Sequence, residues 1–319
     1  MGGSKENCSQ SHKSGGKKTA AEKTDDEKTA AEKAAAEKER RAAIDTCAGL
    51  REFLNKQYQS ALVARVDPGE IKSDPCNIAP DAQYRGAENQ LYRVEIHRGG
   101  PEDIATFKWS RDNGSIATAW LSSEGDMLRV ANARGFAAGN WIELSDDTLD
   151  LQGKPGILVK LAAVDNDALI VDMDSIAEGN AQQLNWSSEL RNPKVRRWDQ
   201  IASEDIVLAD GAVPVVMGKA AGKSKKDMWL DLEDGIQISF APKGNYRSGD
   251  YWLIPARVAT GNIEWPVNEE KQQPALLPPR GVRHHYAPLA LMVAKDGRLD
   301  VKTSCRCEFT AIRACEGEK

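Results

Sequence analysis

Cysteine is the residue type in this chain with the clearest capacity for metal or redox chemistry. Three of the six cysteines, Cys305, Cys307 and Cys315, fall in the last fifteen residues. Together with Cys76 they could supply four thiolates to zinc, because tetrahedral zinc favours soft sulfur ligands. The Cys-x-Cys spacing is atypical of such a site, since on a strand it points both sulfurs to one face. We expect free or buried thiols first, a disulfide within this group second and zinc third.

An adjacent pair of histidines is a second candidate for metal binding or acid-base chemistry. His284 and His285, with Glu264 earlier in the chain, could form a His and carboxylate site of a metal-dependent hydrolase. Neighbouring residues on a strand face opposite ways, so both rings cannot ligate one ion without a bend. We expect one histidine in the core and one on the surface.

Tryptophans could provide flat faces for stacking against sugars. Trp109, Trp252 and Trp265 are the candidates to face a ligand, out of eight tryptophans in the chain. Most tryptophans of β domains belong to the core, so a cell-surface or carbohydrate-binding β-module is an alternative rather than the leading expectation.

Short motifs of known enzyme classes are missing from the sequence. It contains no Gly-x-Ser-x-Gly, no Gly-x-x-x-x-Gly-Lys-Ser/Thr, no His-Glu-x-x-His, and no Gly-x-Gly-x-x-Gly after an expected strand. We therefore assign no catalytic residue, and expect a non-enzymatic protein without a cofactor.

The elements that must position these residues are strands. Apolar and polar side chains alternate over residues 91–97 and 106–110, the period of a half-buried strand, and Asp112, Asn113 and Gly114 then form a turn. From Gln83 onward, short apolar segments recur between turn residues, which predicts a mainly β protein, a barrel or sandwich. Residues 136–171 are expected to contain a small closed barrel of about five strands. The predicted body has two β-subdomains, residues 76–190 and 191–319.

The N-terminal quarter differs from this body. Residues 1–18 are predicted to be disordered, and residues 19–43 form an Ala/Glu/Lys repeat that favours a solvated helix or spacer. Residues 44–66 are predicted to be an amphipathic helix that docks either on the chain's own β body or on a partner subunit. The docking face comprises Ile44, Leu50, Phe53, Leu54, Tyr58 and Leu62.

Composition limits the classes of partner. The net charge of -5 gives no argument for nucleic-acid binding, which favours basic domains. No apolar run approaches the roughly 20 residues that cross a bilayer, and the N-terminus lacks the apolar core of a signal peptide. We expect synthesis in the cytoplasm, no membrane span, and protein partners, including further copies of the chain in a homo-oligomer.

Several long motifs resemble one bacterial family. They include AENQLYRVEIH within residues 80–97, ATFKWSRDNGS at 105–115 and RSGDYWLIPA at 247–256. The resemblance covers about residues 74–310 and is to a family of unknown function whose typical members sit in phage-tail-like gene neighbourhoods. Here a charged helical segment stands where those members open with a segment of phage-structural type. The resemblance implies no reaction. It implies a structural or accessory component of a phage-tail-like or contractile injection assembly, part of the particle or released with it.

Overall fold

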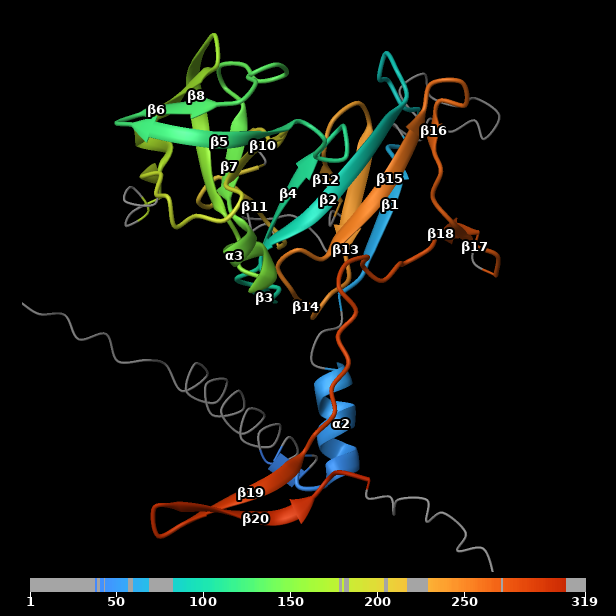
Figure 1. The fold of residues 1–319 in the computed structure, drawn as a ribbon. Helices are drawn as coiled ribbons and strands as arrows, with labels where there is room; N and C mark the ends of the chain where they lie inside the picture. Colours follow the sequence, from blue (N-terminus) through green and yellow to red (C-terminus); the bar gives the residue numbers. More distant parts are fainter. Residues whose placement is uncertain are drawn as a thin grey trace, which may run out of the picture. The chain divides into compact units, whose positions relative to one another are not determined.

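The chain is mainly β in its computed structural model, which confirms the predicted fold class. The structure describes residues 38, 41–42, 44–56, 60–68, 83–177, 180, 184–203, 206–216, 229–270 and 272–307. The predicted disordered segment 1–18 and most of the charged segment 19–43 lie outside these residues. The chain forms two compact units, Gln57–His284 and a smaller one that combines Met1–Lys56 with His285–Lys319. Figure 1 shows the fold.

A closed six-stranded barrel forms one half of the larger unit (Figure 1). Its core includes the apolar side chains of Leu128, Ile142 and Val195. The barrel has one strand more than expected and begins earlier, at Ala117. In the order of the barrel, the strands are β10 (Lys194–Trp198), β5 (Ala117–Glu124), β6 (Met127–Val130), β9 (Ala168–Asp172), β8 (Ile157–Asp165) and β7 (Trp141–Ser145).

Two sheets form the other half of the larger unit. The five-stranded sheet has the order β11 (Val213–Pro214), β4 (Thr106–Ser110), β2 (Gln90–Arg98), β15 (Tyr251–Arg257) and β16 (Asn262–Ile263). The three-stranded sheet has the order β1 (Leu62–Val66), β13 (Ile236–Phe240) and β12 (Leu230–Asp231). Apolar side chains from both sheets, including Tyr92, Ile238 and Trp252, belong to one core cluster, so the sheets form a sandwich.

The strands predicted at 91–97 and 106–110 are confirmed, and so is the turn predicted at 112–114. β2 pairs with β4 in antiparallel register, with Val94 opposite Trp109. Asn113 and Gly114 both have positive φ, 59° and 64°, and the amide of Ser115 donates to the carbonyl of Asp112. Asn and Gly adopt this left-handed conformation more readily than other residues, which is why the strand can end so sharply.

The expected division of the body near residue 190 is wrong. β2 pairs with β15, placing Glu95 opposite Tyr251, so one sheet joins segments from both expected subdomains. β10 lies after the expected boundary, yet it closes the barrel between β5 and β7. Strand pairing between distant segments decides this architecture, and the local pattern of apolar residues does not reveal it.

The amphipathic helix is shorter than predicted. It is α2, Cys47–Lys56, and Leu62 instead begins β1, opposite Phe240. Leu62 is completely buried in the core of the larger unit, so it is not a partner-docking residue. The sequence Leu-Val-Ala-Arg-Val also satisfies a period of two, and pairing with β13 selects the strand.

The smaller unit contains α2 and a β-hairpin. β19 (Ala290–Lys295) pairs with β20 (Arg298–Ser304) around Asp296 and Gly297, which both have positive φ. Thr46 caps α2: its hydroxyl accepts from the amide of Gly49 at 3.0 Å. Short elements complete the fold: β3 (Gly100–Pro101), α3 (Asp147–Leu151), the 3-10 turn η1 (Met173–Ser175), β14 (Asn245–Tyr246), β17 (Val267–Asn268) and β18 (Gln273–Pro274).

Candidate functional site

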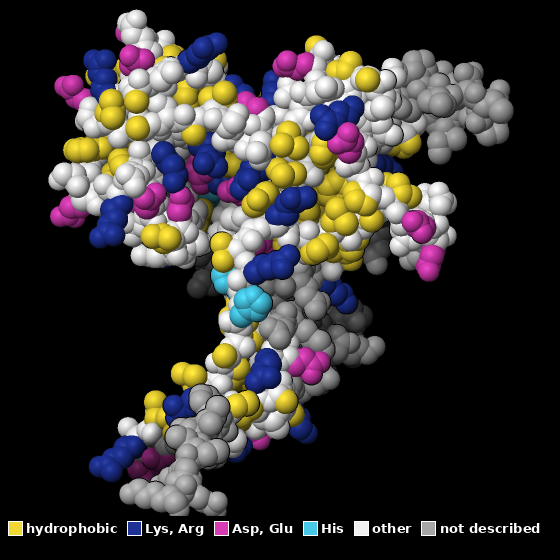
Figure 2. Space-filling model, turned by 45° about the vertical axis from the view of Figure 1, so that its right-hand side comes forward, with side chains coloured by type: hydrophobic (Ala, Val, Ile, Leu, Met, Phe, Trp, Pro, Cys, Tyr) yellow, Lys and Arg dark blue, Asp and Glu magenta, His cyan; other side chains and the backbone are white. Residues whose placement is uncertain are grey.

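A cavity of about 380 Å³ in the larger unit is the best candidate for a binding site. Charged residues of β2, β4 and β7 line it, as do the loop after α3, strand β10 and residues 248–250. Figure 2 shows basic and acidic side chains gathered together on the body of the protein. Perturbed titratable groups in a concave site are characteristic of functional sites.

An ion pair between Lys108 and Glu143 lies at the bottom of this cavity. The ammonium Nζ is 2.5 Å from both carboxylate oxygens of Glu143, and the two side chains are only 4% and 8% exposed. The carboxylate also accepts from the indole Nε1 of Trp198 at 2.9 Å and from the amide of Gly156 at 3.1 Å. Burial alone would raise the pKa of Glu143, but the charge of Lys108 and these hydrogen bonds lower it to about 2.

Glu95 and Arg93 extend the charged cluster along β2. Glu95 lies 3.2 Å from Nζ of Lys108 and accepts a hydrogen bond of 2.6 Å from Nε of Arg93. The guanidinium of Arg93 in turn stacks 3.6 Å from the ring centre of Tyr251. The ammonium of Lys108 therefore interacts with two carboxylates, those of Glu143 and Glu95. Its Nζ also lies over the ring of Trp198, 4.5 Å from the ring centre. This network fixes the base of the cavity.

His97 contributes an incompletely bonded imidazole to the same cavity. Its side chain is 7% exposed, and its buried Nδ1 has no hydrogen-bond partner, the nearest carboxylate oxygen being Oε1 of Glu143 at 3.8 Å. Burial, reinforced by the charge of Lys108, lowers the pKa of His97 to about 4. The ring is therefore neutral at pH 7 and can both donate and accept a hydrogen bond.

The mouth of the cavity carries further charges. Lys194 forms an ion pair with Asp150, which lies in α3. Asp250 also lines the cavity; burial raises its pKa to about 6, although Arg247 and a hydrogen bond with Ser60 act in the opposite direction. Lys154 and Arg196 line the cavity too, and neither forms an ion pair within the described part of the chain.

A second charged network ties the turn after β4 to the barrel. Asp199 accepts from the amide of Arg111 at 2.9 Å, and its other carboxylate oxygen lies 3.2 Å from Nε of Arg197. Arg197 also donates to Asp112 at 2.7 Å, while Arg111 donates to Glu233 at 2.7 Å. These contacts link β4, β10 and the turn before β13, and they hold the barrel against the sheets.

The predicted metal site at His284, His285 and Glu264 has no support. Glu264 is exposed and binds the guanidinium of Arg257 through both oxygens, at 2.9 Å each. Both histidines are exposed, which corrects the expectation that one lies in the core. Among the residues that the structure describes, no group of three His, Cys, Asp or Glu side chains could hold a metal ion. His284 instead lines the mouth of the cavity.

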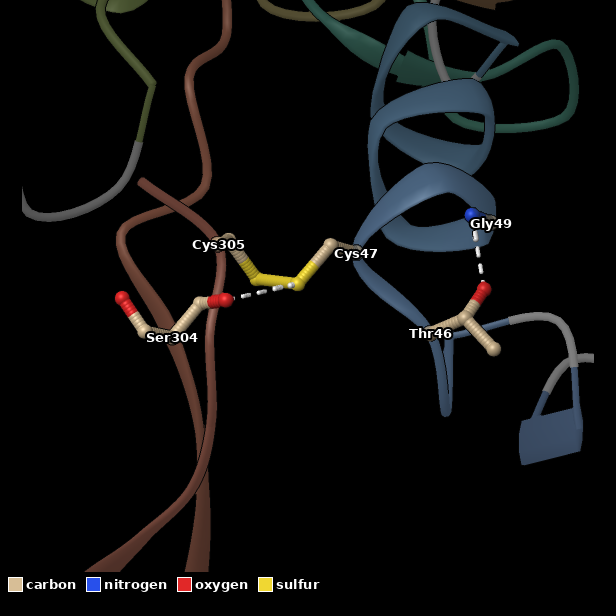
Figure 3. Close-up of a disulfide and its surroundings, with 5 residues drawn as sticks. All are labelled: Thr46, Cys47, Gly49, Ser304 and Cys305. Atoms are coloured by element: carbon tan, nitrogen blue, oxygen red, sulfur yellow. Dashed lines mark hydrogen bonds between the residues drawn. A yellow bond between two sulfur atoms is a disulfide. The ribbon is translucent and has the colours of Figure 1, made fainter. Parts of the chain in front are cut away.

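The cysteines pair differently from every arrangement expected. Cys305 forms a disulfide with Cys47, a residue outside the group considered, and their Cα atoms are 5.4 Å apart (Figure 3). Cys305 therefore has no thiolate to offer zinc. Cys307 is an exposed free thiol, and Cys76 and Cys315 lie outside the described residues. The disulfide joins α2 to the end of β20, and the two cysteines are separated by 258 in residue number.

The tryptophans proposed to face a ligand belong to the core or pack against it. Trp109 and Trp252 are 3% and 2% exposed, and Trp265 is half-buried against the same core. The indole nitrogens of Trp252 and Trp265 donate to the carbonyls of Leu277 and Ala275. Trp109 and Trp252 therefore cannot form an exposed sugar-stacking face, and that expectation is wrong for them.

The predicted docking face has an unexpected neighbour in the smaller unit. Ile44, Leu50, Phe53 and Leu54 are half-buried there, while Tyr58 lies outside the described residues. β19, β20 and the residue just before β19 expose large apolar side chains on the surface. These are Leu289 (67% exposed), Met292 (47%), Val293 (44%), Leu299 (69%) and Val301 (61%).

Sequence reasoning missed the cavity because its residues read as the solvent face of two strands. Glu95, His97 and Lys108 occupy the polar positions of the alternating pattern, which ordinarily point to water. In the structure all of β4 is buried, because the barrel covers that face. The usable signal was a run of polar positions that carry charges of both signs next to large apolar residues. Such a run suits a buried ion-pair network.

Comparisons with known proteins give a family but no activity. A model of a family of unknown function, DUF6519, matches residues 6–317. No curated protein and no solved structure matches the chain. In the described part of the chain, no helix is both long enough and apolar enough to cross a membrane.

Proposed function

The chain belongs to the DUF6519 family of unknown function, and from that premise we propose that it is a non-enzymatic structural or accessory subunit of a larger assembly. The assembly is of the phage-tail-like or contractile injection type that the sequence motifs suggest. The observation that carries the proposal is the exposed apolar hairpin of the smaller unit.

The hairpin has the character of a surface that is covered in an assembly. A two-stranded hairpin is at best marginally stable in water when nothing covers it. Leu299 and Val301 of β20 both expose more than half of their surface, and every residue of that strand is exposed. Apolar side chains gathered in this way typically mark protein contact surfaces. The proposed occupant is a neighbouring subunit of the particle, either another protein or a further copy of this chain.

The disulfide supports a role for this hairpin as the contact surface for a neighbouring subunit. Cys47 and Cys305 attach the end of β20 to α2, and Lys302 forms an ion pair with Asp45 beside that helix. These links attach an otherwise weak hairpin to α2 and its N-terminal end. Disulfides persist mainly outside the reducing cytoplasm. A subunit made in the cytoplasm and released with a particle would acquire this bond on release.

The proposal is tested by the composition of the particle made by the source organism. We expect the wild-type chain to co-purify with the particle in a fixed ratio. The double variant L299S/V301S removes two exposed apolar side chains from β20 and is expected to lower that occupancy at least tenfold, about 1.4 kcal/mol in binding. Quantitative mass spectrometry of the purified particles measures the ratio.

A matched control separates the hairpin from general surface effects. Val258 is 46% exposed in the larger unit, and V258S removes a similar apolar side chain from that surface. This control is expected to leave occupancy unchanged. Particles that contain none of the wild-type chain would refute the proposed role, and full occupancy by L299S/V301S would refute the proposed surface.

A further inference from the structure

We propose that the cavity in the larger unit binds a small hydroxylated oxyanion, a molecule that carries a carboxylate or phosphate together with a hydroxyl group. A structural role needs no such cavity, so this inference goes beyond the proposed function. It rests on the unpaired cations at the mouth and the incompletely bonded histidine within.

The size and construction of the cavity suit a small molecule. Its volume of about 380 Å³ lies at the lower end of the range typical of small-ligand sites, roughly 300–1,000 Å³. The base is pre-formed, because Lys108 is held by Glu95, Glu143 and the ring of Trp198. A ligand therefore meets fixed polar groups, and little free energy is lost in ordering them.

Pairing of charges around the cavity leaves positive charge for the ligand. Arg93 is paired with Glu95, and Lys194 is paired with Asp150. Lys154 and Arg196 form no ion pair within the residues described. A guanidinium binds the two oxygens of a carboxylate or phosphate in a fork, and an ammonium adds a point charge. These two side chains are the anion-binding pair.

The acidic residues on the same wall do not cancel that pair. Glu143 and Glu95 are committed to Lys108 and Arg93. Asp250 interacts with Arg247 and with the hydroxyl of Ser60. The carboxylates that line the cavity are thus already compensated, and the uncompensated side chains are cationic.

His97 supplies the contact for the hydroxyl group. A proton on Nδ1 faces the carboxylate of Glu143, 3.8 Å away, whereas a lone pair on Nδ1 would face the same negative charge. The Nδ1–H tautomer is therefore favoured, and Nε2 carries the lone pair. Nδ1 is buried without a partner, and we assign Nε2 as the atom that the ring offers to the cavity it lines. Nε2 accepts a hydrogen bond from a hydroxyl of the ligand.

The test uses four probes and isothermal titration calorimetry on the full chain. Glycerate and glycerol 3-phosphate carry an oxyanion and hydroxyl groups, while acetate and inorganic phosphate carry the oxyanion without an alcohol. We expect one of the hydroxylated probes to bind at least threefold more tightly than its plain counterpart. Comparison of glycerate with glycerol 3-phosphate then distinguishes a carboxylate ligand from a phosphate ligand.

Two sets of variants locate the binding. K154Q/R196Q removes both anion-binding charges and is expected to weaken binding at least tenfold, whereas R129Q/K243Q makes the same charge change at exposed positions outside the cavity. H97N keeps a donor near Nδ1 and loses the acceptor at Nε2, so it should abolish the preference for hydroxylated probes. H97Q keeps an acceptor near Nε2 and should retain that preference.

The outcomes are decisive in both directions. Binding that K154Q/R196Q weakens and R129Q/K243Q does not, with a hydroxyl preference lost only in H97N, establishes the site. No binding of any of the four probes at 10 mM, roughly the limit of useful affinity for so small a ligand, overturns it. Equal losses in both charge variants also overturn it, because they would reflect net charge alone.

Discussion

At the scale of single residues, the buried ammonium of Lys108 is the centre of the charged cluster in the larger unit. Its side chain is 4% exposed and its charge is balanced by Glu143 and Glu95. Removing one partner of a buried pair leaves an uncompensated charge, which destabilises proteins far more than the pair itself stabilises them. The cluster is therefore sensitive to any change in one of its members.

The variant E143Q tests this dependence. It keeps the shape of the side chain but removes the charge, so we expect the free energy of unfolding to fall by about 3 to 5 kcal/mol. Urea denaturation followed by tryptophan fluorescence measures the change. The double variant K108M/E143L removes both charges and should be less destabilised than E143Q. The reverse order would mean that the pair itself, rather than the charge left behind, provides the stability.

The neutral state of His97 makes stability depend on pH. The pKa of this ring is lowered to about 4 in the folded protein by burial first and by Lys108 second, against 6.5 when unfolded. Between these two pKa values the unfolded chain binds a proton at this residue and the folded chain does not. The contribution of His97 to the free energy of unfolding is therefore fully present above pH 6.5 and is lost as the pH falls to about 4. The loss from this residue is on the order of 3 kcal/mol.

Urea denaturation between pH 7 and pH 4 checks that prediction. H97Q should show a flatter dependence on pH over this interval. Glu143 titrates lower, because its folded pKa of about 2 lies below the value of 4.5 for a free side chain. Its contribution is present above pH 4.5 and is lost only toward pH 2, so the two effects separate. An unchanged slope in H97Q would assign the acid sensitivity to other groups.

At the scale of elements, the smaller unit joins a helix to a hairpin through one covalent bond. The disulfide closes the loop between Cys47 and Cys305, which have a sequence separation of 258. In the chain-entropy account, cross-linking so long a loop restricts the unfolded state strongly. Without the bond, the hairpin and the residues around α2 keep only noncovalent contacts such as the ion pair of Lys302 with Asp45, and the hairpin should open more often.

The variant C47S/C305S tests the contribution of the disulfide. We expect the amides of β19 and β20 to exchange with deuterium at least tenfold faster, because the hairpin opens more often without its link to α2. The amides of β2 and β15 provide the internal control, since they lie in the core sheet of the larger unit. Equal protection of the hairpin in the variant would show that its own strand pairing is sufficient.

These elements also show how far the sequence predicts the fold. Alternation correctly predicts β2 and β4, and positive φ at Asn113 and Gly114 follows from local turn chemistry. The local pattern fails at 62–66, where a helical and an alternating pattern coincide and pairing with β13 decides. It fails for the cavity as well, because residues from β2, β4 and β7 meet only when the barrel forms over the sheet. The disulfide partner of Cys305 lies too far along the chain for spacing to identify it.

At the scale of the whole molecule, the two units differ in what stabilises them. Every buried apolar cluster of the described residues lies between Leu62 and Ala256, inside the larger unit. The smaller unit relies on α2, the hairpin and the disulfide. Under the proposed function, the smaller unit would gain the burial that it lacks when a neighbouring subunit covers its hairpin.

This difference predicts two separate transitions on heating. Reductant should lower or abolish the transition of the smaller unit, because both cysteines lie in that unit, and it should lower the transition of the larger unit by less, because that unit lies inside the loop that the disulfide closes. A probe bound in the cavity should raise only the transition temperature of the larger unit. At a hundredfold excess over its dissociation constant, binding stabilises that unit by about 2.7 kcal/mol. Differential scanning calorimetry, with and without dithiothreitol and glycerol 3-phosphate, measures both effects. A single transition that both additives shift together would show that the units unfold as one, and the hairpin would then be a stable part of the body rather than a surface awaiting its partner.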